Sequence, residues 1–512
     1  MSAELLPPDS LTLDATEVVL SAGLAVDDGH PRELDRIFYD TFDGLLHAEG
    51  LALVHEEGRL VLLDGPTGGE RAVLAAPRPN APLSPSTLAP GPLRDALCDV
   101  CGIRVLLALV QVHSRVRPMR VLDDERKTVV RIRLEEPELI SNGADTMLRP
   151  RVRLGAVRGY DNELERVVGA LESELGFKVA DQPLVDEAVR AAGGVPGGVQ
   201  SKLKIALRPD QRSDEAASGV LLRLLEVIEA NLDGTLADID SEFLHDLRVS
   251  VRRSRAVQRE LKRVFPPDEL ARFRAEFKWL QQATGDARDL DVYLLEFDEY
   301  QAMVPESMRG DLEPLRGVLR ERREGAHQEM VQALRSERAA NLFAEWRTFL
   351  DGLVSMPAVE RPDAARPIAE VAGRRIRKVY KRMVKMGKAI EPAGPAEDYH
   401  ELRKKGKELR YLLELFATPL YPEDVVKPMI KTLKSLQDVL GRHQDREVQT
   451  ATVRALADEV ASLREGPRAL MAMGVLVERL GEDEQAARSA FAERFEAFAS
   501  KDQRQVVKET FA

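Results

Sequence analysis

The chain has 512 residues, of which 44% are hydrophobic, 31% charged and 5% aromatic, and its formal net charge is -12 at pH 7. A chain of this length divides into several domains, and the negative total argues against a protein that coats nucleic acid through its overall field. No run approaches the ~20 apolar residues of a membrane-spanning helix, and the first residues do not resemble a signal peptide. Because there are only two cysteines, we expect a cytoplasmic protein.

The first 205 residues predict a mainly β domain. Strand-like segments lie at 11–20, 36–41, 51–64, 103–139 and 147–159, and helices are expected at 161–177 and near 182–192. The stretch 64–95 is rich in Gly and Pro, which predicts a loop or flexible insertion. Cys98 and Cys101 form a CxxC pair without the further soft ligands of a structural zinc site, so we interpret them as small residues near the start of a strand.

The sequence changes character after Asp214. The Gly-rich stretch 191–215 marks a domain boundary, and the remainder shows helical periodicity interrupted by short Pro and Gly turns. We expect about eight to ten amphipathic helices there. The fold class predicted for the whole chain is therefore α+β, with an all-α chain as the second possibility.

A basic segment of the helical region occurs twice. The segment "FLHDLRVSVRRSRAVQREL", residues 243–261, aligns with "DYHELRKKGKELRYLLELF", residues 398–416, at an offset of 155 residues, and 278–289 then aligns with 434–445 at an offset of 156. Similarity over about 70 residues indicates that a whole helical module has been duplicated. We place the two copies at 214–360 and 366–505, within a helical domain of residues 214–505.

Each copy places one histidine and three cations on a single helix face. Positions i, i+3, i+7 and i+10 of an α-helix fall within roughly 80° of arc. These positions are occupied by His245, Arg248, Arg252 and Arg255 in the first copy and by His400, Arg403, Lys407 and Arg410 in the second. A single basic stripe is usually a solvated surface, but two in register, neither containing an acid, predict a groove that binds a polyanion.

The chemistry of the stripes favours phosphate. Arginine and lysine suit phosphate oxygens, and the segment 371–388 adds further cations without a carboxylate. Almost no aromatic side chain is available for base stacking, so linear polyphosphate is a better partner than nucleic acid. The two histidines predict phosphate binding or a switchable hydrogen-bond donor, with a buried structural role as the alternative.

These motifs resemble the CHAD family, the conserved-histidine α-helical domain, over residues 214–500. The matching stretches are "FLHDLRVSVRRSR", "FKWLQQATGDARDLDV", "DYHELRKKGKELRYLLELF" and "LKSLQDVLGRHQD". The resemblance implies two pseudo-symmetric four-helix bundles across a basic groove, binding of inorganic polyphosphate, and association with polyphosphate granules. Combining it with the repeat, we predict a polyphosphate-binding set of Arg223, His245, Arg248, Arg252, Arg255, Lys278, Arg374, Lys378, His400, Arg403, Lys407, Arg410 and Lys434.

Residues 1–205 are similar to the CYTH family, the triphosphate tunnel fold, in "IFYDTFDGLLHAEGLALVHEEGRLVLL", "RPRVRLGAVRGYDNELERV" and "SKLKIAL". Catalytic members carry an ExExK strand near the N-terminus, which the equivalent stretch here, "LTLDATEVVLSAG", lacks. We therefore predict a degenerate β-barrel or tunnel-like domain without catalytic residues, metal or cofactor. Arginines that alternate on its strands either line a tunnel or face solvent; they are Arg115, Arg117, Arg131 and Arg133.

Three functions follow from these residues. The first is a non-enzymatic protein that binds inorganic polyphosphate between two facing basic helical stripes and associates with polyphosphate granules. The first alternative is a metal-dependent triphosphatase or cyclase-like enzyme in residues 1–205. The second alternative is a helical interaction protein that binds nucleic acid or acidic protein. The sequence indicates no oligomeric state.

Overall fold

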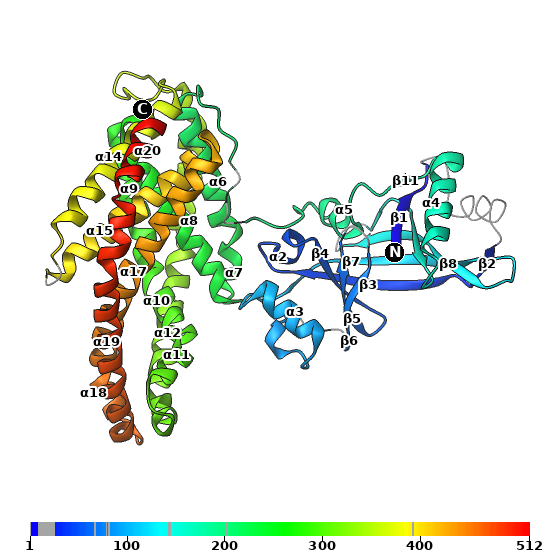
Figure 1. The fold of residues 1–512 in the computed structure, drawn as a ribbon, viewed down its shortest axis with the longest axis horizontal. Coiled ribbons are helices and arrows are strands. Elements are labelled where there is room, and N and C mark those ends of the chain that lie inside the picture. Colours follow the sequence, from blue (N-terminus) through cyan, green and yellow to red (C-terminus); the bar gives the residue numbers. More distant parts are fainter. Residues whose placement is uncertain are drawn as a thin grey trace. The chain divides into compact units, whose positions relative to one another are not determined.

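The structure is a computed structural model that describes residues 2–8, 26–65, 68–77, 79, 82–141, 145–200, 203, 205–391 and 394–511. The chain divides into two compact units, residues 1–200 and 201–512. Strands dominate the first unit and helices the second (Figure 1). No helix among the described residues is long and apolar enough to cross a bilayer.

The N-terminal unit is a curled antiparallel sheet. Its strands are β1 (Ser2–Leu6), β2 (Val26–Asp28), β3 (Arg32–Asp40), β4 (Leu51–Glu56), β5 (Arg59–Asp64), β6 (Glu70–Ala75), β7 (Leu107–Leu122), β8 (Thr128–Ile140), β9 (Thr146–Met147), β10 (Arg151–Ala156) and β11 (Lys178–Val179). The order along the sheet is β11-β1-β10-β8-β7-β3-β4-β5-β6, with β2 paired to β7 and β9 to β8. The long strands β7 and β8 form its centre (Figure 1).

The helices of this unit pack on the sheet through their apolar faces. The helical segments are α2 (Leu45–Ala48), the 3-10 turn η1 (Pro85–Thr87), α3 (Pro92–Cys101), α4 (Asp161–Leu175) and α5 (Leu184–Ala191). Leu164, Val167 and Leu171, spaced at i, i+3 and i+7, place one face of α4 against β8 and β10. The α3 face packs in the same way on β3, β4 and β5.

Two expectations for this unit need correction. The stretch 64–95 is not one loop, because it contains β6, η1 and the first turn of α3. Cys98 and Cys101 lie in α3 rather than near the start of a strand, and both are free thiols. Burial raises the pKa of Cys101 to about 12, so this thiol stays protonated. The stretch "LTLDATEVVLSAG" lies outside the described residues.

The second unit is helical throughout its described length. Its first half contains α6 (Ser213–Ala230), α7 (Leu232–Leu236), α8 (Ser241–Glu260), η2 (Lys262–Val264), α9 (Pro267–Ala283), α10 (Gly285–Leu295), α11 (Phe297–Met303), η3 (Glu306–Met308), η4 (Gly310–Leu312), α12 (Glu313–Leu334), α13 (Glu337–Gly352) and η5 (Leu353–Ser355). Its second half contains α14 (Ile368–Ala389), α15 (Ala396–Leu412), the π-helical turn η6 (Leu413–Ala417), α16 (Thr418–Leu420), α17 (Glu423–Ala455), α18 (Ala457–Ala461), α19 (Gly466–Phe498) and α20 (Lys501–Thr510). Short turns divide the chain into more segments than the eight to ten expected.

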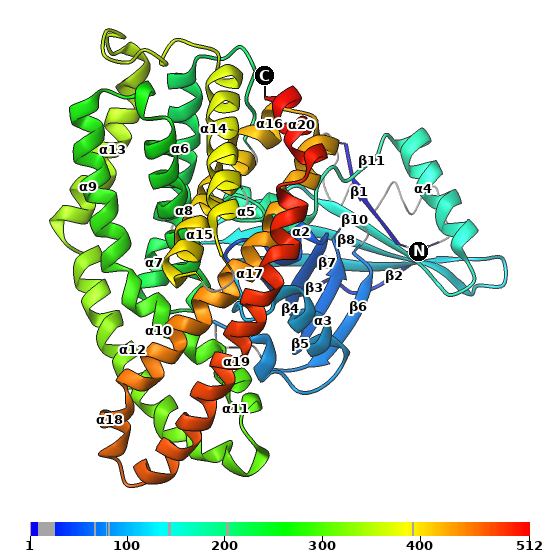
Figure 2. The ribbon, with the colours of Figure 1, turned by 60° about the vertical axis from the view of Figure 1, so that its left-hand side comes forward.

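The repeat inferred from sequence is present in the helix boundaries. Helices of the second half begin 155 or 156 residues after their counterparts: α6 at Ser213 and α14 at Ile368, α8 at Ser241 and α15 at Ala396, α9 at Pro267 and α17 at Glu423. In each half these helices pack on one another in succession (Figure 2). The helical region thus consists of two related bundles.

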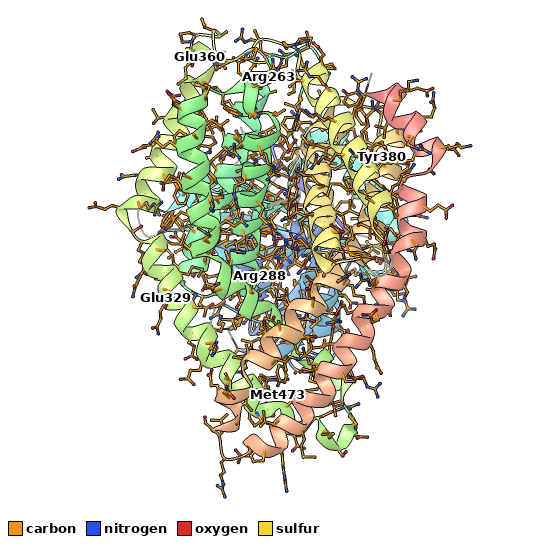
Figure 3. All side chains as sticks on the ribbon, turned by 90° about the vertical axis from the view of Figure 1, so that its left-hand side faces the viewer. Arg263, Arg288, Glu329, Glu360, Tyr380 and Met473 are labelled. Atoms are coloured by element: carbon orange, nitrogen blue, oxygen red, sulfur yellow. The ribbon has the colours of Figure 1, made fainter. Side chains whose placement is uncertain are left out.

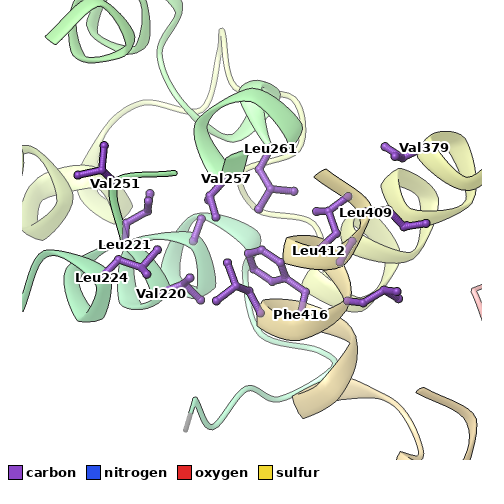
Figure 4. Packing of buried hydrophobic residues seen from close by; sticks show 14 of the residues in the cluster. Val220, Leu221, Leu224, Val251, Val257, Leu261, Val379, Leu409, Leu412 and Phe416 are labelled. Atoms are coloured by element: carbon purple, nitrogen blue, oxygen red, sulfur yellow. The ribbon is translucent and has the colours of Figure 1, made fainter. Parts of the chain in front are cut away.

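The two halves share a continuous apolar core. Val220, Leu224 and Val257 of the first half lie beside Leu412 and Phe416 of the second (Figure 4). All five side chains are almost completely buried, and burying a side chain of this kind stabilises the fold by about 1.5–3 kcal/mol. This core holds α8 against α15 and therefore sets the spacing of the two basic stripes.

Candidate functional site

A cleft of about 620 Å³ lies between α8, α15, η6 and α17, and we call it the central cleft. Helices from both halves of the repeat build it. The basic side chains that line it are His245, Arg252, Arg253, Arg403, Lys407, Arg410, Arg442 and Arg446. The acidic ones are Glu296, Glu414, Asp438 and Asp445. The structure therefore brings five members of the predicted set, His245, Arg252, Arg403, Lys407 and Arg410, into one cavity.

Arg252 and Lys407 occupy equivalent positions of the repeat and both line the central cleft. Neither forms an ion pair with a residue that the structure describes, and the buried Nε of Arg252 has no hydrogen-bond partner there. Unpartnered buried donors on a cation are costly. An anion in the central cleft would satisfy them.

The electrostatic environment of Lys407 confirms that positive charge accumulates here. Burial, followed by the nearby guanidinium groups of Arg403 and Arg252, lowers the pKa of Lys407 to about 8, although Asp445 opposes the shift. Burial is the largest cause of the shift, and the neighbouring guanidinium groups add to it. The ammonium group is still largely protonated at pH 7.

Carboxylates from outside the stripes compensate part of this charge. Glu414 lies between Arg253, at 3.1 Å from Nη2, and Arg410, at 2.6 Å from Nε. Arg403 donates from Nη2 to Asp445 Oδ1 at 2.9 Å. The stripes themselves contain no acid, but the cleft does, because η6 supplies Glu414 and α17 supplies Asp438 and Asp445.

The two repeat histidines contact equivalent partners. His245 Nδ1 is 2.9 Å from Arg288 Nη2, and His400 Nδ1 pairs with Gln444 Oε1, 156 residues after Arg288. A guanidinium group can only donate, so Nδ1 of His245 accepts and the ring proton lies on Nε2. Of these two histidines, His245 belongs to the described lining of the central cleft and His400 does not. His245 thus links α8 to α10, and His400 links α15 to α17.

Arg248 lies outside the cleft lining, unlike its counterpart Arg403. It is buried, and its Nη1 donates to the Gln281 carbonyl at 2.8 Å and to Thr284 Oγ1 at 2.9 Å. Burial lowers its pKa to about 10, which leaves it charged at neutral pH. Its contacts join α8 to the end of α9.

Other members of the predicted set lie elsewhere. Arg255 and Lys278 line a separate cavity of about 340 Å³ together with Arg259 and Arg274. Arg223 pairs with Glu226 on its own helix, and Arg374 pairs with Asp363 at 3.0 Å. Lys378 and Lys434 are exposed on α14 and α17 and do not belong to the described lining of the central cleft.

Sequence reasoning missed three cations of the central cleft: Arg253, Arg442 and Arg446. The spacing of the last two in the sequence could have indicated them, because Arg442 and Arg446 follow Asp438 by four and eight residues and so share one face of the helix with it. Arg442 and Arg446 contact Asp483 of α19 at 3.1 and 2.7 Å. Arg253 directly follows the stripe residue Arg252 in the sequence, and it pairs with Glu414 in the cleft.

The described inner face of the N-terminal sheet is also charged. The first strand supplies Glu4, which pairs with Arg151 and lies 3.1 Å from Arg153 Nε. Arg36 of β3 pairs with Glu135 of β8, and both are buried. Burial lowers the pKa of Arg36 to about 9, and the nearby Arg153 adds to the shift. Arg36, Arg151 and Arg153 are thus each paired with a carboxylate of the same sheet.

The four arginines expected to line a tunnel or face solvent differ in exposure, and Arg117 is half-buried. Arg115 and Arg131 are exposed. Arg133 is half-buried, and burial lowers its pKa. Among the described residues, no group of three or more His, Cys, Asp and Glu side chains could hold a metal ion.

The family model for the CHAD domain matches residues 219–454, which include α8, α15 and almost all of α17. Residues 219–454 are a CHAD domain. Two uncharacterized proteins from strains of Mycobacterium tuberculosis are each 27% identical to the chain over 307 residues, covering 57% of this chain and 56% of the relative. The chain thus spans about half the length of the curated relatives that it matches.

Solved structures to which the chain is similar include a CHAD domain from the plant Ricinus communis, which is 24% identical, covers 57% of this chain and 95% of that one, and has a TM-score of 0.49. PptA from Streptomyces chartreusis is 20% identical, covers 56% and 100%, and has a TM-score of 0.43. A Hippeastrum protein with a dominant triphosphatase activity is 14% identical, covers 38% and 96%, and has a TM-score of 0.26. The curled sheet of residues 1–200 fits a tunnel-like domain.

Proposed function

We propose that this protein binds inorganic polyphosphate in the central cleft of its CHAD domain. The observation that supports this most directly is the pair Arg252 and Lys407, one cation from each half, which face the same cavity without an ion-pair partner among the described residues. A flexible chain of phosphates places a charge at every unit, so it can meet cations from both helices at once. Arg403 and Arg410 would then interact both with the phosphate chain and with their carboxylate partners, Asp445 and Glu414.

Polyphosphate fits the central cleft better than nucleic acid does. Tyr411 is the one aromatic residue among the described side chains that line it, so bases would find little to stack on. The cavity is also mainly polar, which suits an inorganic anion with no apolar part. The proposed location is the cytoplasm, on polyphosphate granules.

The test is titration with long-chain polyphosphate at several salt concentrations. Arg252→Gln and Lys407→Met each remove one unpaired cation, so we expect about tenfold weaker binding from each and a shallower dependence on salt by about one unit of slope. The matched controls are Arg320→Gln on α12 and Lys431→Met on α17, both exposed and outside the cleft lining. They should bind like the unmodified protein.

Equal affinity of all four variants would contradict the assignment of the central cleft. A DNA oligonucleotide that competes on equal terms with polyphosphate at moderate salt would favour a general polyanion-binding protein instead. Salt dependence must accompany either result, because counterion release makes an affinity at one salt concentration uninformative.

For the N-terminal unit we propose an accessory or docking role. Several interior cations already have carboxylate partners, as in Arg36 with Glu135 and Arg151 with Glu4, so binding a triphosphate beside them would require these pairs to open. Release of phosphate from tripolyphosphate by the full chain, in the presence of Mg²⁺ or Mn²⁺, would contradict this role and support an enzyme. The assay uses the unmodified protein.

A further inference from the structure

A further basic cavity lies between α14 and the C-terminal helix α20, and we call it the C-terminal groove. Its volume is about 640 Å³, and its cations are Arg377, Lys381, Lys501, Arg504 and Lys508. No described carboxylate lines it, and none of the five cations forms an ion pair with a described residue. The central cleft, by contrast, includes four carboxylates.

Helix geometry aligns these cations in two rows. Arg377 and Lys381 are four residues apart on α14, while Lys501, Arg504 and Lys508 follow an i, i+3, i+7 spacing on α20. Residues with these spacings share one face of a helix. Two cationic rows that face one cavity repel each other, and an anion between them removes that cost.

The floor of the C-terminal groove is apolar and well packed. It contains Val384 and Val507, both buried, and the ring of Tyr380. The Tyr380 hydroxyl donates to the Phe498 carbonyl at 2.8 Å, which fixes the ring where α14 meets the C-terminal segment (Figure 3). Burial raises the pKa of Tyr380 to about 12, so the ring adds no negative charge. An ordered apolar floor stabilises ligands that have an apolar part.

An apolar cavity of about 780 Å³ adjoins this groove, because Lys501 and Arg504 line both. Its apolar side chains include Ile390, Phe491 and Phe495, and its carboxylates are Glu496 and Asp502. Each cavity falls within the 300–1,000 Å³ that is typical of small-molecule sites. Lys501 and Arg504 thus lie between the basic C-terminal groove and the adjoining apolar cavity.

We propose that the C-terminal groove binds a small amphiphilic anion. Its anionic head group would lie between α14 and α20, near Arg377 and Arg504, and its apolar body would cover Val384 and Val507 and extend into the adjoining apolar cavity. A bare phosphate chain gains nothing from an apolar floor. A membrane surface would need apolar side chains that protrude, whereas these valines are buried.

Calorimetric titration of the full chain with decyl phosphate, kept below its micelle concentration, tests the inference. We expect saturable binding of one molecule per chain, and at least tenfold weaker binding of inorganic phosphate and of decanol, which each lack one half of the ligand. Arg377→Gln and Arg504→Gln should each weaken decyl phosphate binding by about tenfold. Arg382→Gln, exposed on α14 but outside the described lining of the groove, is the matched control and should have no effect.

Separate outcomes distinguish this inference from the proposed function. Arg252→Gln in the central cleft should leave decyl phosphate binding unchanged; if it abolishes that binding, the amphiphile occupies the central cleft and the inference is wrong. Inorganic phosphate that binds as tightly as decyl phosphate would also overturn it, as would binding only to phosphatidylserine vesicles. Failure to bind polyphosphate would contradict the function proposed for the central cleft and would leave the inference about the C-terminal groove intact.

Discussion

Helices α8 and α15 carry the same spacing of one histidine and three cations, but they deliver different side chains to the central cleft. Arg252 and Lys407 are equivalent and both line it. Arg403 also lines it, whereas its counterpart Arg248 is buried against α9. Duplicated sequence positions therefore do not guarantee duplicated surroundings, and the second half supplies more of the stripe cations in the cleft.

The helices that follow each stripe explain the difference. In the first half, α9 ends at Ala283, and its last turn offers the Gln281 carbonyl and the Thr284 hydroxyl to Arg248. In the second half, α17 continues without a break, and Leu440 occupies the position equivalent to Thr284. Leucine offers no side-chain acceptor.

With no such acceptor beside it, Arg403 pairs with Asp445 in the cleft. The glycine that follows does not distinguish the two halves: a Cβ at Gly285 or Gly441 would lie 3.8 Å from Arg248 or Arg403, an ordinary contact distance. The break in one helix therefore decides which arginine is structural and which is available to a ligand.

Arg248→Gln gives the largest expected effect and tests the structural half of the comparison. We expect a loss of about 2–3 kcal/mol in the free energy of unfolding, because the change leaves the buried acceptors of α9 without their charged donor. Denaturant unfolding measures it. In the protein that remains folded, polyphosphate affinity should stay within about twofold of normal; a selective loss of affinity with unchanged stability would place Arg248 in the binding site.

Arg403→Gln tests the other half and should show the reverse. Polyphosphate affinity should fall by about tenfold, since a charged contact is lost. Stability should change by less than about 0.5 kcal/mol, because the partner Asp445 is largely exposed. Titration and unfolding of the same preparation measure both. If Arg403→Gln unfolds the protein as readily as Arg248→Gln, the two arginines are equivalent after all.

The pH dependence of binding should report Lys407. A bound polyanion raises the lysine pKa from its free value of about 8, so affinity is greatest below pH 8 and falls, by up to about tenfold, as pH rises through that value. Lys407→Arg should remove this step, because arginine stays charged. Titrations at pH 7 and pH 9 provide the measurement, and an unchanged step in Lys407→Arg would assign it to another group.

Thr284→Val removes only the hydroxyl that holds Arg248. The expected loss is about 1 kcal/mol in the free energy of unfolding, smaller than for Arg248→Gln because the Gln281 carbonyl still accepts. Combining the two substitutions should cost less than the sum of the single effects, since they act on one interaction. Strict additivity in this double-mutant cycle would show that the hydroxyl does not stabilise Arg248.

Lys407→Met should make the free protein slightly more stable. The folded pKa of about 8 lies below the ordinary value of 10.5, so the charged lysine disfavours folding at neutral pH. Its replacement should add about 1 kcal/mol to the free energy of unfolding at pH 7. Stability of the unmodified protein should rise between pH 8 and 10, where the unfolded chain keeps a proton that the folded chain has lost. A thermal scan that finds Lys407→Met less stable would contradict this.

Much of the helical fold could be predicted from periodicity and repetition, because each helix must bury an apolar face at a fixed spacing. The elements that were missed are short or lie in unpromising composition: β1, which supplies Glu4, precedes the first strand expected, and β6 lies inside a Gly- and Pro-rich stretch. A strand of five or six residues is stabilised by its neighbours in the sheet, so its own sequence carries little signal.

The site could be predicted only as far as single helices allow. Spacing placed Arg252, Lys407 and Arg410 on stripes that do meet in one cleft. It could not reveal that Asp445 would come from α17 to meet Arg403, or that Thr284 would bury Arg248. Such pairs depend on tertiary packing between segments that are distant in sequence.

The turn η6 has a consequence for how the second half can evolve. The offset between the copies changes from 155 to 156 between Arg410 and Glu423, so the second copy carries one additional residue in the segment that includes this π-helical turn. A wide turn absorbs an insertion without shifting the helices on either side. The additional residue thus lies in the segment that carries Glu414, the carboxylate in contact with Arg253 and Arg410, and deleting it from the turn should leave the helices on either side in register.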